Sequence, residues 1–381
     1  MEGELMHILF ACNEYPPASC GGIGIFTKLL AEGLAERGIA VTVAGMYVGI
    51  EDERWEEQNG VTVVRLPNMR VGKLSPFLNR MRFYRWVQKY ISTYKVNIVE
   101  YPDFHSQLFM RHSVPVVLRL HGGNLFCNLH GSLHCTRASA FFEKRAIRTA
   151  DCIVGVSQYV LDYTLNRVQN NPTAFKVVIH NFTDTTRFRP TVTNEKKNKI
   201  LYFGAIAEHK GVLVLARAAN IFLRALPGAQ LYFIGRDAQL NGKNVNIHIA
   251  EIIKPDLAQN VIILPPLNNI DLFEEISKAV LCVFPSRMEA FGLTIIESMA
   301  CGTPVIASNC GPIPEIISNG YDGLLVDPDN VEALATSVIR LYNDTELQKT
   351  LGQHARETVL NTFDKDDVIE KNVTLYKNML S

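Results

Sequence analysis

The part of the sequence best suited to chemistry is a loop between a predicted strand and a predicted helix. Residues 279–284 read AVLCVF, an apolar run with the length of a buried strand, and a proline ends it. A helix is predicted over 295–300 and another strand over 305–307. In a parallel sheet, ligands bind at the carboxyl ends of the strands, and free N–H groups at a helix N-terminus suit a phosphate. We therefore expect the amides of residues 292–295 to face an anion.

Two carboxylates flank this expected anion site. Glu289 lies in the loop, and Glu297 lies about one turn into the predicted helix. A phosphate repels a carboxylate, so these side chains are better suited to accept hydrogen bonds from sugar hydroxyls than to contact the anion. The spacing alone would occur by chance in most chains of this size, and both glutamates could be ordinary surface residues of an α/β domain.

The whole block of residues 285–315 is far more specific than the two glutamates. Its sequence, PSRMEAFGLTIIESMACGTPVIASNCGPIPE, resembles the signature of the retaining, GT-B-fold glycosyltransferases of family 4, also called glycosyl transferases group 1. The resemblance implies an α/β fold of two facing, Rossmann-like, doubly wound domains with the active site in the interdomain cleft. It also implies transfer of a sugar from a nucleotide-diphosphate sugar to an acceptor hydroxyl with retained anomeric configuration, without a metal ion or another cofactor.

The same resemblance assigns roles within the block. Glu297 would hold the ribose hydroxyls of the donor, and the catalytic-site residue Glu289 would hold the hydroxyls of the transferred sugar. The rest of the donor-binding set in this block is Phe291, Gly292, Leu293 and Thr294.

A second motif, residues 204–211 (GAIAEHKG), resembles the loop with which the family grasps the donor phosphates. Lys210 matches the family's lysine and is expected to stabilise the departing diphosphate. Ala205 stands where an arginine is usual, so one cation is missing from the diphosphate site, and Arg236 is a candidate to replace it. The loss also leaves open a protein that binds a nucleotide sugar without turning it over.

The N-terminal half supplies the third set of residues. A strand over 7–11, a glycine-rich turn, a helix over 26–37 and a strand over 40–44 form a predicted βαβ unit. Its glycine spacing is not the dinucleotide-binding fingerprint. In the resembled family a paired glycine here lets the backbone approach the donor diphosphate and the acceptor, and Gly21 and Gly22 match it. His121 follows a predicted strand over 114–120, and the resemblance places it near the transferred sugar.

Length and composition indicate the number of domains and the class of protein. A chain of 381 residues predicts two domains. We expect an N-terminal domain over 1–190, completed by a C-terminal helix over 364–381, and a nucleotide-sugar-binding domain over 191–363 that opens with a polar linker. The formal net charge of zero argues against bulk binding of nucleic acid. No uncharged apolar run reaches 18 residues and the N-terminus does not read as a signal peptide, so we expect a cytoplasmic protein whose cysteines are reduced.

One segment suggests a surface partner. No acidic residue occurs between residues 58 and 99, whereas aromatic and aliphatic residues alternate with eight basic ones: Arg65, Arg70, Lys73, Arg80, Arg82, Arg85, Lys89 and Lys95. Such a segment could lie on the inner face of a membrane or bind an anionic acceptor. It could equally be a solvated helix that packs its apolar side on the sheet.

A further loop, residues 121–135 (HGGNLFCNLHGSLHC), is rich in histidine and cysteine. His130 and His134 could share one helical face and bind zinc, but the glycines at 122, 123 and 131 argue against a stable helix. We favour an acceptor-binding loop, with a glycan, a lipid-linked sugar or a small molecule as acceptor. Two other functions stay open: a GT-B-fold nucleotide-sugar isomerase and a non-catalytic nucleotide-sugar-binding protein.

Overall fold

The computed structural model describes residues 6–18, 21–69, 72–104, 110–129, 136–168, 174–191 and 198–381. The chain divides into two units, residues 1–181 with 366–381, and residues 182–365. The first unit ends at residue 181, before the expected boundary at residue 190. Residues 182–190 belong to the second unit because they are hydrogen-bonded to it: the Thr183 N–H donates to the Phe363 carbonyl at 3.1 Å, and Arg356 donates to the Phe188 carbonyl at 2.7 Å. Of the expected linker, residues 192–197 lie outside the described part of the chain.

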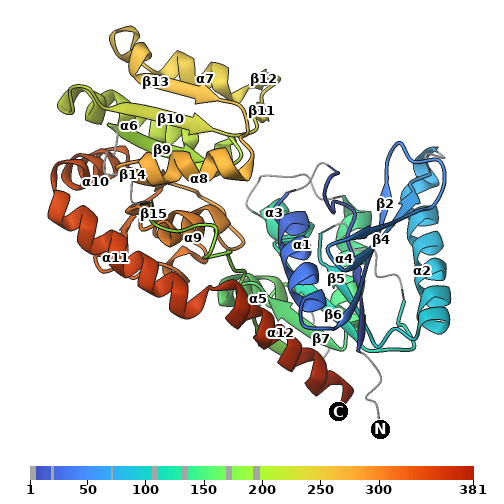
Figure 1. The fold of residues 1–381 in the computed structure, drawn as a ribbon. Helices are drawn as coiled ribbons and strands as arrows, with labels where there is room; N and C mark the ends of the chain where they lie inside the picture. The colour runs from blue at the N-terminus through green and yellow to red at the C-terminus, as the bar shows by residue number, and fades with distance from the viewer. Residues whose placement is uncertain are drawn as a thin grey trace. The chain divides into compact units, whose positions relative to one another are not determined.

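The first unit is built on an eight-stranded sheet with the order β3-β4-β2-β1-β5-β6-β7-β8 (Figure 1). Every neighbouring pair is parallel except β3 with β4, an antiparallel pair that the sequence did not suggest. The strands are β1 (His7–Ala11), β2 (Ala40–Tyr47), β3 (Arg54–Gln58), β4 (Val61–Pro67), β5 (Ile98–Pro102), β6 (Val116–Leu120), β7 (Cys152–Gly155) and β8 (Phe175–Val178).

Six helices belong to the described part of this unit. They are α1 (Gly22–Ala35), α2 (Ser75–Tyr94), α3 (Asn124–Leu129), α4 (Arg137–Thr149), α5 (Gln158–Leu165) and α12 (Lys365–Leu380). Helix α1 begins four residues before the expected start, so Gly22 and Gly24 are helical instead of forming a turn. Helix α12 returns to the first unit and lies along it, drawn in red in Figure 1.

The second unit has a six-stranded, fully parallel sheet with the order β13-β10-β9-β14-β15-β16. Its strands are β9 (Lys199–Phe203), β10 (Gln230–Ile234), β13 (Val261–Leu264), β14 (Leu281–Phe284), β15 (Val305–Ser308) and β16 (Leu324–Val326), with a small hairpin of β11 (Gln239–Leu240) and β12 (Lys243–Asn244). Its helices are α6 (Val212–Ala225), α7 (Val245–Ile252), α8 (Asn269–Lys278), α9 (Leu293–Ala300), α10 (Val331–Asn343) and α11 (Thr345–Thr362).

Both sheets are doubly wound. In each, the chain first adds strands on one side of the opening strand and then crosses to the other side, so the order reverses between β1 and β5 in the first unit and between β9 and β14 in the second. The expected pair of Rossmann-like α/β domains is therefore confirmed. Ligands of such sheets bind outside the carboxyl ends of the strands at the reversal. These two places are where the functional residues have to be sought.

The basic segment 65–95 proves to have two different parts. Arg65 is a buried structural residue: it is 5% exposed, donates to the carbonyls of Tyr15 and Pro16, and pairs with Glu56. The interpretation of Arg65 as part of a surface for a membrane or an acceptor is therefore wrong. On α2, one side packs into the core through Phe83, Val87, Tyr90 and Ile91.

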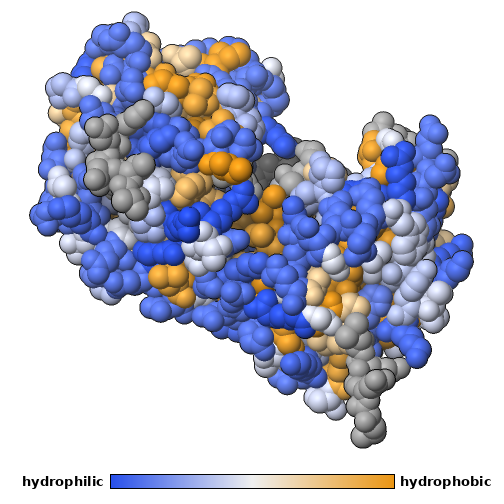
Figure 2. Space-filling model, viewed as in Figure 1, coloured by the Kyte–Doolittle hydropathy of each residue, from blue (hydrophilic) through white to orange (hydrophobic). Residues whose placement is uncertain are grey.

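The other side of α2 is open to solvent. Its exposed residues include Leu74 just before the helix, Phe77 and Leu78 near its start, and Arg82, Arg85 and Lys89 farther along. The side of α2 visible in Figure 2 is coloured mainly blue to white, so hydrophilic residues predominate there. Across the described residues, no helix is both long enough and apolar enough to span a membrane.

Candidate functional site

The structure brings Lys210 and Glu289 together at the reversal of the second sheet. Lys210 ends a short 3-10 turn after β9, and Glu289 lies in the loop after the neighbouring strand β14. The Lys210 Nζ lies 2.7 Å from Glu289 Oε2, and Ser286 donates its hydroxyl to Glu289 Oε1 at 2.9 Å. The lysine is thus fixed by a carboxylate at the place where the fold puts ligands.

Close backbone packing holds this ion pair in place. Gly211 has a φ of +74°, and a Cβ at this position would lie 1.8 Å from the Pro285 carbonyl oxygen. The Arg287 N–H donates to the His209 carbonyl at 2.9 Å. The loops after β9 and β14 therefore touch backbone to backbone, which only glycine allows at position 211.

This packing predicts a large effect of Gly211→Ala. Gly242, in the β11–β12 turn, is a matched control because its φ is +79° and nothing lies within 4 Å of its Cβ position. The strain from the positive φ is common to both variants, so their difference isolates the overlap with Pro285. We expect Gly211→Ala to destabilise the second unit by about 3 kcal/mol more than Gly242→Ala. Hydrogen exchange of peptides from 198–365 measures this, and equal effects would contradict the described packing.

The N-terminus of α9 lies beside the ion pair. Gly292 caps the helix with a φ of +128°, and the Thr294 Cγ2 lies 3.6 Å from the Cβ position of Gly204 in the loop after β9. Among the described residues, nothing accepts a hydrogen bond from the amides of Leu293 and Thr294. Free amides and the positive end of the helix dipole favour an anion at this point.

Two details of the expected anion site differ in the structure. The Ile295 N–H donates to the Gly292 carbonyl at 3.0 Å, so it belongs to the first turn of the helix and is not free. The side chain of Phe291 is 2% exposed and meets Phe363 edge-to-face at 5.6 Å. The side chain of Phe291 is therefore part of the core.

Glu297 is partly buried one turn into α9. Burial raises the pKa of its carboxyl to about 8, and the charge of Arg187 offsets only a small part of that effect. None of the described side chains donates a hydrogen bond to this carboxyl. A carboxyl without donors is ready to bind the hydroxyls of a ligand.

The raised pKa predicts how stability depends on pH. The folded protein keeps a proton on Glu297 that the unfolded chain releases near the ordinary glutamate pKa of 4.5. The contribution to stability is therefore complete below pH 4.5 and is lost as the pH rises through 8. We expect the stability of Glu297→Gln relative to wild type to rise by about 2 kcal/mol from pH 5 to pH 8.5. Calorimetry checks this, and a pH-independent difference for Glu297→Gln would mean that its carboxyl is not buried.

In the first unit, the paired glycines lie after β1, at the reversal of the sheet, and His121 lies after β6, the strand next to β5. His121 follows β6, its backbone N–H donates to Asp103 Oδ1 at 2.9 Å, and its ring meets Phe26 of α1 edge-on at 5.0 Å. Gly21 caps α1, and its N–H donates to Glu14 Oε2 at 2.5 Å. Burial, with a smaller effect of Arg119, lowers the pKa of His121 to about 3, so the imidazole is neutral at physiological pH.

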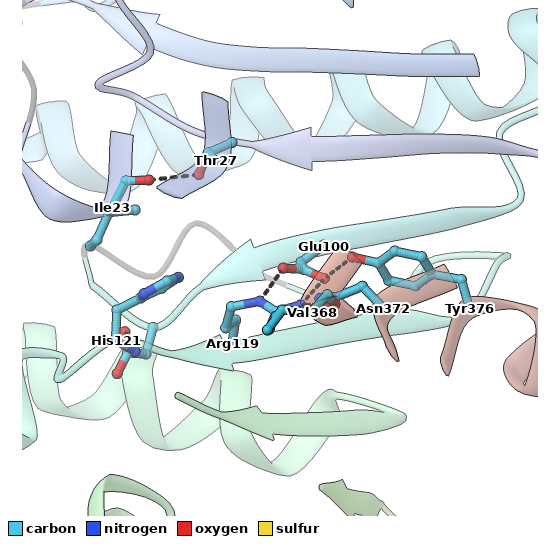
Figure 3. Close-up of polar contacts among 9 residues, drawn as sticks. Ile23, Thr27, Glu100, Arg119, His121, Val368, Asn372 and Tyr376 are labelled. Atoms are coloured by element: carbon cyan, nitrogen blue, oxygen red, sulfur yellow. Dashed lines mark hydrogen bonds and ion pairs between the residues drawn. The ribbon is translucent and has the colours of Figure 1, made fainter. Parts of the chain in front are cut away.

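A buried polar network supports the strand that carries His121 (Figure 3). The Arg119 Nε donates to Glu100 Oε1 at 2.6 Å, and Nη2 donates to Asn372 Oδ1 of α12 at 2.6 Å. Tyr376, also of α12, donates its hydroxyl to Glu100 Oε2 at 2.7 Å. Since all four side chains are nearly or fully buried, the network joins α12 to the centre of the sheet.

The sequence reasoning missed three acidic residues of the first unit. Glu14 and Asp103 follow β1 and β5, and Asp103 is fully buried. Glu143 is fully buried in α4, next along the same face to Ala146 and Ile147. His121 was predicted because it directly follows a parallel strand, and the same criterion would also have predicted Asp103. Glu143 could have been predicted as an acidic residue on the apolar side of a predicted helix.

A metal site receives no support from the described residues, among which no group of three or more His, Cys, Asp or Glu side chains could hold a metal ion. Both zinc candidates, His130 and His134, lie outside the described part of the chain. So does much of the expected acceptor-binding loop. Cys127, which is described, donates its thiol to the Gly122 carbonyl.

Comparison with known protein families identifies the family of the chain. The family description Glycosyl transferases group 1 matches residues 184–358, and Glycosyltransferase Family 4 matches residues 20–187. The chain belongs to the group 1 glycosyltransferases of the GT-B fold. The two matches together span both units and include the predicted residues of each.

Individual relatives are similar to this glycosyltransferase over nearly its full length. An uncharacterized glycosyltransferase of Methanocaldococcus jannaschii is 24% identical, and the match covers 98% of each chain. Sucrose-phosphate synthase of Thermosynechococcus elongatus has a similar structure, with a TM-score of 0.81 and 24% identity over 98% of this chain and 99% of that one. Anabaena HepE in complex with UDP and glucose gives a TM-score of 0.77 with 18% identity over 98% and 99%. At these identities the two structures show a common fold.

Proposed function

We propose that this glycosyltransferase moves a sugar from a nucleotide-diphosphate sugar to an acceptor hydroxyl and retains the anomeric configuration. The observation that carries the proposal is the Lys210–Glu289 ion pair beside the free amides of α9, at the sheet reversal of the second unit. A fixed cation and a helix N-terminus are the groups that a departing diphosphate needs. The Anabaena relative that was solved with UDP and glucose supports a nucleotide-sugar donor.

In the proposed reaction, the bond between the anomeric carbon and the diphosphate breaks. Negative charge grows on the leaving phosphate, where Lys210 and the amides of Leu293 and Thr294 stabilise it. Glu289 keeps Lys210 in place and accepts hydrogen bonds from hydroxyls of the transferred sugar, while Glu297 binds the ribose. The leaving phosphate takes the proton of the attacking acceptor hydroxyl on the same face, which retains the configuration.

His121 and the paired glycines Gly21 and Gly22 of the first unit are proposed to meet the transferred sugar and the acceptor. A neutral imidazole suits this task because it can donate or accept a hydrogen bond without repelling a developing positive charge on the sugar. A small pocket at the same sheet edge is lined by Cys12, Glu14, Ile23, Pro102 and Phe104, among others. We propose that the acceptor is a glycan, a lipid-linked sugar or a small molecule.

The test is product analysis by NMR with a panel of nucleotide sugars and simple glycoside acceptors. We expect one donor series to give a glycoside with the anomeric configuration of the donor, and slow donor hydrolysis without an acceptor. A product of opposite configuration would contradict retention. Conversion of the donor sugar without an acceptor would identify an isomerase, and binding without any turnover would identify a binding protein.

Contact of the segment 65–95 with a membrane is a separate proposal, now limited to the exposed side of α2. The basic residues Arg82, Arg85 and Lys89 could meet anionic head groups there, with Leu74 and Phe77 at the interface. We expect binding to vesicles that contain anionic lipid, and at least a threefold loss with the three basic residues replaced by glutamine. Vesicle flotation measures it, and equal recovery with neutral vesicles would refute the proposal.

A further inference from the structure

Two fully buried carboxylates, Asp103 and Glu143, lie beneath the backbone that carries His121. They come from different elements, the end of β5 and the middle of α4. The Cβ position of Gly123 lies 2.5 Å from Glu143 Oε1 and 2.9 Å from Asp103 Oδ2. Both carboxyl groups therefore converge on one glycine, and any side chain at residue 123 would displace them.

The partners of the two carboxyl groups belong to one loop: they are backbone amides and, for Glu143, also the side chain of Asn124. Asp103 accepts from the N–H of His121 at 2.9 Å through Oδ1 and from the N–H of Gly123 at 2.7 Å through Oδ2. Glu143 accepts from the N–H of Leu125, at 3.1 Å through Oε2 and 3.3 Å through Oε1. Amides of 121, 123 and 125 are thus fixed by side chains from outside the loop, and α3 starts from this fixed segment.

Charging two neighbouring carboxylates at once in a buried place costs much free energy, because they repel each other and both lose water. Burial, and then the charge of Asp103, raise the pKa of Glu143 to about 8, so the pair holds one proton on Glu143 at neutral pH. Asp103 then carries the charge, and each of its two oxygens is used by an amide. Glu143 accepts from the Leu125 amide and from the backbone and side chain of Asn124.

We propose that Asp103 and Glu143 are positioning residues for sugar transfer: they hold the backbone of residues 121–125 in the conformation that presents His121 and its two glycines to the substrates. The inference rests on the proposed function, since it assumes that His121 meets the transferred sugar. Neither acid touches the substrate in this account. Their contribution lies in a fixed geometry, for which a misplacement of about 1 Å can cost about a hundredfold in rate.

The two acids should respond differently to amide substitution. Asp103→Asn turns one acceptor oxygen into an NH₂ group that faces an N–H donor, so one loop amide loses its partner. Glu143→Gln keeps an acceptor oxygen and copies the protonated acid. We therefore expect Asp103→Asn and Glu143→Ala to lower kcat by about 10- to 100-fold, and Glu143→Gln to recover most of the rate lost in Glu143→Ala.

The experiment has two readouts on the full-length chain. The first is kcat for transfer compared with the Kd of the free nucleotide, which should stay within about twofold because the nucleotide site belongs to the second unit. The second is hydrogen exchange of the amides of 121–125, expected to speed up by at least about tenfold in Asp103→Asn and Glu143→Ala, with β6 and β7 unchanged.

Unchanged exchange and unchanged kcat in Asp103→Asn would overturn the proposal, and so would a Glu143→Gln as slow as Glu143→Ala. If Asp103→Asn does not fold, the two Glu143 variants give the same test. If wild type transfers no sugar, the proposed function fails on its own. The exchange readout then still shows whether the two acids fix the loop.

Discussion

Lys210→Ala is expected to lower the turnover of sugar transfer by more than about a hundredfold, which corresponds to about 2–4 kcal/mol of lost transition-state stabilisation. The variant removes the cation that we propose stabilises the leaving phosphate, and it leaves the Glu289 carboxylate, which is only slightly exposed, without its 2.7 Å partner. An unpaired carboxylate would then repel the diphosphate as it leaves. Steady-state kinetics with saturating donor measure the effect.

A matched control comes from another lysine of the second unit. Lys243 pairs with Glu251 on the surface, with both side chains more than half exposed, so Lys243→Ala should leave the rate unchanged within about twofold. Lys210→Arg keeps the charge and should recover part of the loss. A near-normal rate for Lys210→Ala would refute the role of Lys210.

Glu100→Gln is expected to cost the first unit about 3–5 kcal/mol of unfolding free energy, because it leaves the fully buried guanidinium of Arg119 without a counter-charge. The same substitution weakens the bond to Tyr376 and hence the attachment of α12. Both tryptophans of the chain, Trp55 and Trp86, lie in the first unit. Urea unfolding followed by tryptophan fluorescence therefore reports on this unit alone.

A second variant distinguishes the loss of the Arg119–Glu100 ion pair from a loss of packing. Adding Arg119→Met to Glu100→Gln removes the uncompensated charge, so the double variant should regain at least half of the lost stability. If the double variant is as unstable as the sum of the two single variants, the buried pair does not act as a unit. In that case the damage comes from packing.

The sequence predicted best where local patterns and the fold agree. The apolar run 7–11 became the parallel strand β1, and the run 279–284 contains the buried parallel strand β14 from Leu281 on, because parallel sheets are covered on both faces and their strands are apolar throughout. The loop after β14 was predicted from the same reasoning. The meeting of Lys210 and Glu289, 79 residues apart, follows from the adjacency of β9 and β14 in the sheet order.

What the sequence could not predict depends on contacts between distant segments. Strand β3, RWEEQ, is charged and largely exposed, and only its antiparallel pairing with β4 makes it a strand. Arg65 looked like a surface cation, but the carbonyls of residues 15 and 16 bind it in the interior. Asp103 and Glu143 are 40 positions apart in the sequence, yet their carboxyl groups both lie next to Gly123. Charge patterns along the chain carry no information about such partners.

The most direct test of the donor site in the second unit is nucleotide binding by ligand-observed NMR. UDP, GDP, ADP and dTDP and their sugars would be offered to wild type, Glu297→Ala and Lys210→Ala. We predict that one nucleotide series binds wild type, that Glu297→Ala loses the nucleoside signals, and that Lys210→Ala weakens binding of the diphosphate more than that of the nucleoside monophosphate. Binding that is unchanged in both variants, or no binding of any nucleotide to wild type, would contradict a donor site formed by the loops after β9 and β14.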